Sequence, residues 1–471
     1  VVVGIFGIAP APEHGMVADS RPLHAAVVQH AAKLVSCGHA PTPSSGTGGI
    51  GLVTSRLILE APLFDHHTSL LLGGRTTYAG LVIPFLSEEV RGSNIYFFDL
   101  NGKVTQRIDD NNRLYLSAYH GRDKFKVADL MGLGYGNTSA TLRWSHIFNN
   151  RLSSNLTLLG SKFNYDIDIW VDPYDWSLRA GTQSAQLKYD FSMLWNEDNT
   201  SRWGLSTGFH AFNQGELEDR GGAVVQYLGL DSLTVVTRKA LEHALYFSHD
   251  QRITPLFSLL YGLRLSCLQN IGAEDFYVFD ANHQVADTLH YGKGEIFNTE
   301  IHLEPRLAAM YRIDEVSSVK ASYSRTFQYA QVASAATGGL PFDVWFPVSP
   351  NIKPQRCDQF AVGYFRNFHH DAIETSVELY YKNMHNVIDF KDNAVTYGNV
   401  LIDGELRVGK GRSFGVEFFV RKNTGKLTGW ISYTYSRSFR TIEGINFGRE
   451  YRSPYDRPHN FVIVVNYDIT P

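Results

Sequence analysis

The sequence of 471 residues predicts an all-β protein, and more specifically an antiparallel up-and-down transmembrane β-barrel. Two observations predict this fold: apolar and polar residues alternate through long segments, and the connections between these segments are short and long in turn. Successive side chains of a strand point to opposite faces, so each segment has one apolar and one polar face. Such strands, with short turns at one rim and long loops at the other, are typical of outer-membrane barrels.

The alternation extends over ten residues or more, whereas strands in soluble sheets average about 5–6 residues. In segment 184–195, for example, Leu187 and Tyr189 alternate with Gln186 and Lys188. The same pattern recurs in segments 257–266 and 299–309. A soluble propeller or sandwich would also alternate, but we find no repeat of 40 to 50 residues that would indicate propeller blades.

Polar turn residues mark the connections. The short connections are predicted at 108–112, 148–151, 196–201, 248–252, 312–318, 366–371 and 421–426. The long connections are predicted at 124–137, 166–182, 213–238, 268–295, 331–353, 390–410 and 441–457. We therefore expect two strands before residue 93, seven hairpins between 94 and 440, and one strand at 457–468. An odd total of seventeen cannot close an up-and-down antiparallel barrel.

The composition excludes several other classes of protein. A net charge of −4 provides no basic field for nucleic acid, and three widely separated cysteines favour neither a disulfide framework nor a cysteine zinc site. No GxSxG, HExxH, P-loop or strand-to-helix GxGxxG motif occurs, so we predict no enzyme activity and no cofactor. The histidine pairs at 66–67 and 369–370 fall in predicted turns, where we expect solvated side chains rather than a metal site.

Several segments resemble the barrel of TonB-dependent outer-membrane receptors, of the type whose plug follows a carboxypeptidase-regulatory-like domain. The most specific are GRSFGVEFFVRKNTGKLTGWISYTYSRSFR at 411–440 and YRSPYDRPHNFVIVVNYDIT at 451–470, where a glycine-marked strand, a tight turn, a YTYS strand and a YDRPH loop end follow in order. GTGGIGLVTSRLILEAPL at 46–63 resembles the first barrel strand, although EAP stands where the family more usually has Gly-Pro.

The resemblance implies a 22-stranded barrel with a plug inside it. We therefore expect a barrel portion at 47–471, truncated at both ends, with about 17 of the 22 strands present. Residues 1–46 are expected to form a poorly structured lead-in in which no plug is recognisable. The expected partners are the TonB complex, through a plug not recognised in this chain, and the lipid of the Gram-negative outer membrane.

The resemblance also implies TonB-dependent uptake of a scarce nutrient, which could be a siderophore, haem, cobalamin, an oligosaccharide or a peptide. Three alternatives remain: a passive porin-like channel, a surface glycan-binding or adhesion barrel, and a soluble β-rich hydrolase. Paired carboxylates on neighbouring strands would suit glycoside hydrolysis, but a hydrated lumen wall that contacts a plug explains them more simply.

Two groups of residues are candidates for function. The predicted lumen-facing polar residues are Glu242, Glu300, His302, Glu304, Arg306 and Lys320. The predicted ligand-binding residues, which lie in long extracellular loops, are Trp170, Tyr174, Trp176, Phe342, Trp345 and Phe346. Aromatic rings beside the aspartates of WVDPYDW and LPFDVWF could stack on a sugar ring or a planar chelate.

Overall fold

A computed structural model describes residues 44–63, 67–82, 92–221, 237–334, 343–394 and 399–468. Nearly all regular structure in these residues is strand, and the predicted all-β antiparallel meander is confirmed. The expected lead-in lies outside the described residues, apart from its last three positions. The helices in this part of the chain are short, and none of them is long and apolar enough to cross a membrane.

Nineteen strands form one large sheet, in which nearly every strand pairs antiparallel with its neighbours in the sequence. The strands from the N-terminal side to the middle are β1 (Ser45–Ile50), β2 (Thr54–Leu63), β3 (Thr68–Thr77), β4 (Asn94–Arg107), β5 (Asn112–Val127), β6 (Met131–Ile147), β7 (Leu152–Val171), β8 (Tyr174–Asn196), β9 (Asn199–Asp219), β10 (Arg238–Thr254) and β11 (Phe257–Ile271). The remaining strands of this sheet are β14 (Ile296–Arg312), β15 (Ser317–Gln328), β18 (Gln355–Phe368), β19 (Ile373–Phe390), β20 (Leu406–Lys422), β21 (Leu427–Ile442), β22 (Tyr451–Arg452) and β23 (His459–Tyr467).

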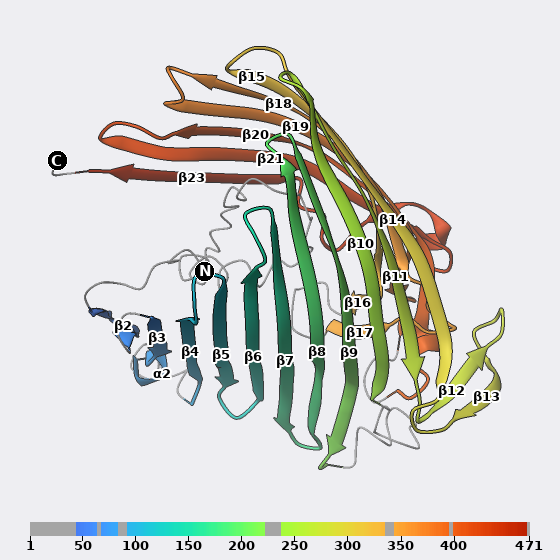
Figure 1. Cartoon of the computed structure of the whole chain (residues 1–471). Helices are drawn as coiled ribbons and strands as arrows, with labels where there is room; N and C mark the ends of the chain where they lie inside the picture. Colours follow the sequence, from blue (N-terminus) through green and yellow to red (C-terminus); the bar gives the residue numbers. More distant parts are fainter. Residues whose placement is uncertain are drawn as a thin grey trace.

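The sheet curls strongly but does not close (Figure 1). Among the described residues, β1 pairs only with β2, and β23 pairs only with β21. Two differences from the predicted seventeen strands explain the count of nineteen. The segment expected to be one strand at 46–63 is the hairpin β1–β2, and β22 is a two-residue strand that lies beside β21 beyond the end of β23.

Three predicted connections are wrong. Residues 248–252 lie inside β10, and the turn to β11 falls at 255–256, where Pro255 suits a turn because its ring fixes φ. The long connections predicted at 124–137 and 166–182 are mostly strand, since β5 and β6 are separated only by 128–130, and β7 and β8 only by 172–173. Polar residues beyond the apolar part of a strand can therefore continue the same ladder of hydrogen bonds.

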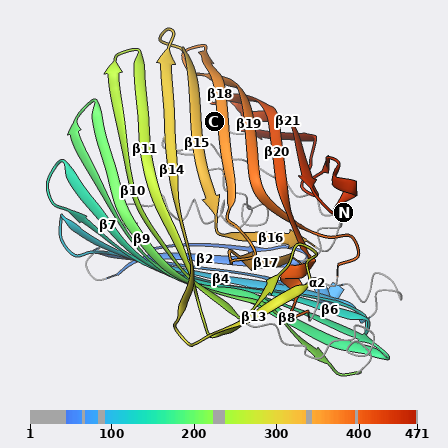
Figure 2. The same ribbon diagram turned by 90° about the vertical axis from the view of Figure 1, so that its right-hand side faces the viewer.

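The other long connections carry their own small elements. Two hairpins occur, β12 (Glu274–Phe279) with β13 (Val285–Tyr291), and β16 (Ala330–Ser334) with β17 (Asp343–Pro347). The short helices are α2 (Ala79–Val82), η2 (Ile402–Glu405) and η3 (Asn446–Gly448). Hairpin β16–β17 lies inside the curve of the sheet, as Figures 1 and 2 both show, whereas β12–β13 stands at the rim.

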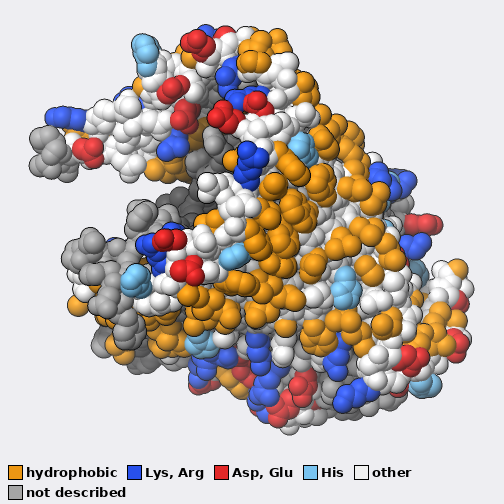
Figure 3. All heavy atoms as spheres, in the orientation of Figure 1, with side chains coloured by type: hydrophobic (Ala, Val, Ile, Leu, Met, Phe, Trp, Pro, Cys, Tyr) orange, Lys and Arg blue, Asp and Glu red, His pale blue; other side chains and the backbone are white. Residues whose placement is uncertain are grey.

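The two faces of the sheet differ as the alternation predicts. Large apolar side chains are exposed on the outer face, including Leu263, Leu265, Ile301 and Leu303 of the paired strands β11 and β14. In Figure 3 they form a broad band across the outer surface, with charged side chains gathered at its margins. Lipid offers no hydrogen-bonding partners, so a wall of this kind must satisfy its backbone groups between strands, as this ladder does.

Candidate functional site

The six polar residues predicted to face the lumen share one face of the sheet. Strand pairs place Arg264 of β11 opposite Glu304, and Leu268 opposite Glu300, while Lys320 of β15 lies opposite Met310 of β14. Paired residues of an antiparallel ladder point to the same side. This side is the inner one, because the residues between them carry the exposed apolar side chains of the outer face.

Arg264 links two of the predicted carboxylates, although it was not singled out from the sequence. Its guanidinium lies 3.7 Å from Glu242 and 3.7 Å from Glu304, and Glu242 lies 3.6 Å from the ring of His210. Arg306 lies 4.0 Å from the second oxygen of Glu304. The cation was missed because the sequence indicates the face of each residue but not the register between strands.

Glu304 is the most deeply buried carboxylate of this group, at 4% exposure. Ser266 Oγ donates a hydrogen bond to it at 2.6 Å, and the hydroxyl of Tyr329 lies 2.8 Å from the same Oγ. A buried charge is costly unless it is paired and hydrogen-bonded, and both conditions hold here. The network therefore fixes the end of β15 and the start of the next connection against the inner wall.

Aromatic rings cover two more of the predicted polar residues. His302 lies 3.1 Å from Glu300 and stacks on Phe327, with ring centroids 4.0 Å apart. The Lys320 ammonium lies 4.6 Å from the centre of the Phe365 ring. These contacts hold the charged side chains along the wall rather than extended into the lumen.

The connection between β15 and β18 folds inward instead of projecting outward. Tyr329 and Val348 pack against Ala240 and Leu268 of the inner wall in one buried cluster. The side chain of Gln214 on β9 donates a hydrogen bond to the carbonyl of Trp345, at 3.2 Å. Hairpin β16–β17 therefore occupies part of the space that the sheet encloses (Figure 2).

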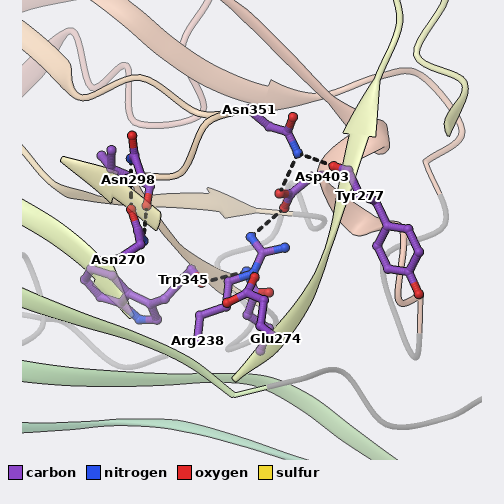
Figure 4. A network of polar contacts seen from close by, with 10 residues as sticks. Arg238, Asn270, Glu274, Tyr277, Asn298, Trp345, Asn351 and Asp403 are labelled. Atoms are coloured by element: carbon purple, nitrogen blue, oxygen red, sulfur yellow. Dashed lines mark hydrogen bonds and ion pairs between the residues drawn. The ribbon is translucent and has the colours of Figure 1, made fainter. Parts of the chain in front are cut away.

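A buried ionic network joins this inward connection to its neighbours (Figure 4). Arg238, at the start of β10, contacts Asp403 of η2 at 2.8 Å and Glu274 of β12 at 3.4 Å. Asn351 donates to the carbonyl of Tyr277 at 2.9 Å and lies 3.4 Å from Asp403. Burial alone would lower the pKa of Arg238, but the two carboxylates outweigh it and raise that pKa. Arg238 thus holds the hairpin β12–β13, the segment around Asn351 and the short helix η2 against the start of β10. We call these connections, together with the hairpin β16–β17, the loop layer.

The predicted aromatic ligand residues are divided between two places. Phe346 is fully buried in an apolar cluster with Phe390 and Ile402, while Trp345 beside it is half-buried. Phe342 lies outside the described residues. The buried position of Phe346 leaves Trp345 as the accessible aromatic ring of this described segment.

The second group is at the end of the hairpin β7–β8, in strand rather than in a long loop. Trp170 lies opposite Asp175, Tyr174 begins β8, and Trp176 packs partly buried beside the cluster around Ile167. Lys126 lies 5.2 Å from the centre of the Trp170 ring. Trp170 pairs with Asp175, whereas Trp176 pairs with Ile169, so the two tryptophan rings point to opposite faces of the hairpin. Trp176, beside the buried cluster, is on the inner face, and Trp170 is on the outer face.

Arg220 connects the carboxylates of this hairpin end. It lies 2.8 Å from Asp175 and 3.6 Å from Asp168. The hydrogen bond that Arg220 donates to the Asp175 carboxylate raises the pKa of Arg220. The carboxylates of WVDPYDW are thus partly neutralised, which reduces their attraction for a cationic ligand.

No metal centre is built from the described residues, since none of their His, Cys, Asp and Glu side chains gather in groups of three or more that could hold an ion. His369 and His370 lie in the turn between β18 and β19 with φ of 52° and 54°, and His66 lies outside the described residues. The candidate site therefore consists of the polar inner face of the sheet and the connections that fold against it.

A match to a protein-family model decides the family. Residues 68–471 match the model described as TonB dependent receptor-like, beta-barrel. The chain belongs to the TonB-dependent receptor family. Its members are receptors of the Gram-negative outer membrane, so the predicted family and localisation are confirmed. A plug that follows a carboxypeptidase-regulatory-like domain stays a prediction.

Solved structures of outer-membrane receptors share the fold at low sequence identity. The alcaligin receptor FauA from Bordetella pertussis is 11% identical with a TM-score of 0.59, over 91% of this chain and 65% of its own. The pyoverdine receptor FpvA from Pseudomonas aeruginosa is 12% identical with a TM-score of 0.63, over 91% and 65%. The ferric-catecholate import receptor Fiu from E. coli is 14% identical with a TM-score of 0.58, over 91% and 68%.

The chain therefore spans slightly less than two thirds of FauA and of FpvA. A search of curated proteins finds no match. The family and the barrel fold are established by these comparisons, whereas the cargo is a separate question.

Proposed function

We propose that this barrel is the outer wall of a TonB-dependent uptake receptor for a scarce nutrient, with an iron chelate as the favoured cargo and haem, cobalamin, an oligosaccharide or a peptide as the alternatives. The inward-folded connection between β15 and β18 carries this proposal. It narrows the enclosed space with a packed hairpin, where a passive porin would need an open aqueous channel. Two of the structurally similar receptors, one that imports ferric catecholates and one bound to pyoverdine, support an iron chelate as the cargo.

In this function the residues of the chain have three roles. On the inner wall, the paired charges of Glu242, Arg264 and Glu304 face the plug. Ion pairs between this wall and the plug would break and form again as the plug moves. The loop layer held by Arg238 positions Trp345 at the entrance. TonB acts on the plug rather than on the wall, so we propose no TonB-binding residue in the barrel.

The test is growth on single nutrients in a Gram-negative host that lacks its own receptors and expresses the gene containing this chain. We expect one of ferric catecholate, haem, cobalamin or an oligosaccharide to support growth only when TonB is present. Equal growth without TonB would favour the passive channel. Surface binding of a glycan without any uptake would favour the adhesion barrel.

Trp345 provides a test of the loop layer within the same assay. The change Trp345→Ala removes the accessible ring, and we expect weaker cargo binding with a normal amount of receptor in the outer membrane. Trp170→Ala tests the other group of predicted ligand residues, at the end of the hairpin β7–β8. Loss of binding in Trp345→Ala alone would support the loop layer, and loss in Trp170→Ala alone would place the cargo at the hairpin β7–β8 instead.

A further inference from the structure

The join between β14 and β15 is incomplete. β14 pairs with β11 from Ile296 to Tyr311, but it pairs with β15 only from Arg306 to Arg312. β15 itself continues to pair with β18 as far as Gln328. Among the described residues, the stretch 296–305 of β14 therefore has a ladder partner on one side only. We call this stretch the open edge.

The two strands part where the end of β15 turns to the inside of β14. The ring of Phe327 stacks on the ring of His302, with centroids 4.0 Å apart, and the hydroxyl of Tyr329 lies 2.8 Å from Ser266 Oγ. His302 and Ser266 belong to the inner face, so β15 passes behind that face on its way to β16 (Figure 2). Side chains thus close the inner side of the join, while the backbone of the open edge has no neighbouring strand.

The open edge presents the backbone groups of alternate residues. In an antiparallel ladder the N–H and C=O of one residue point to the same neighbouring strand, and those of the next residue point to the other. Ser266 Oγ of β11 lies 3.5 Å from the carbonyl oxygen of His302, so the even residues point to β11. Pro305 agrees with this assignment, because proline cannot donate to a ladder and is confined to edges or bulges within sheets. The backbone groups that point to the open edge are therefore those of Thr299, Ile301 and Leu303.

The open edge extends into the apolar band. Ile301 and Leu303 are 61% and 50% exposed on the outer face, and Leu307 and Tyr311 continue this face toward the short turns. A strand of about 9–11 residues crosses the hydrocarbon of a membrane, so the segment from Ile301 to Tyr311 matches one crossing. Hydrocarbon offers no hydrogen bonds, and open sheet edges do not occur in contact with it. The open edge therefore needs a further strand.

We propose that the open edge binds an extended peptide segment of another chain, which adds to β14 as an antiparallel strand. In strand addition of this kind, main-chain hydrogen bonds give affinity and alternate side chains give specificity. The outward side chains of the added strand lie beside Ile301 and Leu303, so we expect them to be apolar and the inward ones to be polar. The proposal depends on the barrel wall and is independent of the cargo.

Hydrogen exchange of the purified protein in detergent tests this proposal. In the free protein, the amides of Ile301 and Leu303 should exchange faster than those of Glu300 and His302, which point to β11. The probe is a peptide of alternating valine and lysine, which has one apolar and one polar face. We expect it to slow exchange at the open amides by about tenfold and to leave β10 and β11 unchanged.

A second peptide, with two central valines replaced by proline, is the matched probe. The valines of the first peptide point outward, so their N–H groups are the ones that face β14. Each lost ladder hydrogen bond lowers affinity roughly fivefold, and we expect the second peptide to bind about 25-fold more weakly.

Two variants of Leu303 test the edge from the side of the protein. Leu303→Pro removes one open donor and leaves the ladder with β11 intact, so we expect peptide binding to weaken about fivefold. Leu303→Ala is the matched control, because it shortens the same side chain and keeps the N–H; it should change binding by about twofold. Exchange of the β11 amides reports whether Leu303→Pro folds, and the comparison of the two peptides requires no variant.

Four outcomes would overturn the proposal. Slow exchange of the Ile301 and Leu303 amides in the free protein would mean that this chain already covers the edge. A lack of protection by the valine–lysine peptide would mean that the edge accepts no strand. Equal binding of the two peptides would show that side chains rather than a ladder hold them. Protection that rises with protein concentration alone would assign the edge to a second copy of the chain.

Discussion

At the scale of single residues, Arg238 is the cation that pairs with two buried carboxylates. Its two carboxylate partners, Asp403 and Glu274, have side chains only 2% and 5% exposed. The change Arg238→Met would leave both carboxylates buried without their cation, and breaking a buried pair in this way costs about 3–5 kcal/mol. We expect the cost to appear as local opening of β12–β13 and η2, measured by hydrogen exchange.

Arg220→Met is the matched control for this prediction. Arg220 also contacts two carboxylates, but its side chain is 35% exposed and its ion pairs are solvated. Such a pair contributes about 0–1 kcal/mol. Equal loss of protection in both variants would show that the Arg238 network does not hold the loop layer together.

A second residue-scale prediction concerns Asp109 in the turn between β4 and β5. The Asn112 side chain donates to its carboxylate at 2.8 and 2.9 Å, and the Asn111 amide donates at 2.8 Å. These hydrogen bonds lower the pKa of Asp109 below its usual 3.8. The folded pKa is the lower one, so the stabilisation is complete above pH 3.8 and is lost as the pH falls through the folded pKa.

An NMR titration of the Asp109 carboxyl in detergent micelles measures this shift. We expect a midpoint below 3.8, and a rise toward 3.8 in Asn112→Ala, which removes the side-chain donor. A midpoint at or above 3.8 in the unaltered protein would contradict the turn geometry.

At the scale of elements, the two faces of one strand predict opposite responses to a new charge. In β8, Leu187 lies on the outer face in the middle of an apolar row that includes Leu142 and Leu158. Leu187→Arg should destabilise the folded barrel by about 2–4 kcal/mol, since arginine at the middle of the bilayer has that cost. Gln186→Arg places the same charge on the inner face and should cost much less.

Unfolding in detergent followed by gel mobility compares these two variants. Both changes add the same side chain to neighbouring positions, so helix or strand propensity cannot explain a difference. Equal destabilisation would mean that the faces of β8 are assigned the wrong way round.

The sequence predicts which face a residue occupies more reliably than where its strand ends. Alternation identified the fourteen strands between 94 and 440, because the lipid-facing half of each strand must be apolar. It failed at 166–182, where the ends of β7 and β8 continue to pair and still alternate, but with their apolar side chains on the inner face. Ile167 and Leu178 are buried there, so the apolar face that marks the lipid-facing part of a strand changes side in this extension.

The candidate site was predictable to the same partial extent. Parity placed Glu242, Glu304 and their neighbours on the inner face, but their pairing with Arg264 depends on register. The contact of Arg238 with Asp403 joins residues 165 positions apart, through loops with no periodicity. Phe346 was predicted as a ligand contact from its aromatic neighbours, whereas packing of β16–β17 against η2 and the end of β19 buries it.

At the scale of the whole molecule, the distribution of apolar surface is inverted relative to a water-soluble protein. Exposed leucine, isoleucine and phenylalanine side chains cover the outside, while Glu304, Ser266 and Asn270 are among the buried residues of the inner side. A contiguous apolar surface of this extent is far larger than a soluble monomer tolerates.

We therefore expect the folded protein to be monodisperse only in detergent or lipid. Moving it into buffer without detergent should cause aggregation, measured by sedimentation, because the outer apolar band would be exposed to water. Replacing exposed Leu263 and Leu303 with serine would reduce the apolar surface and should slow aggregation without restoring solubility. A compact, monodisperse species in plain buffer would mean that the orange band of Figure 3 is covered by protein rather than by lipid, and the soluble β-rich alternative would then replace the membrane barrel.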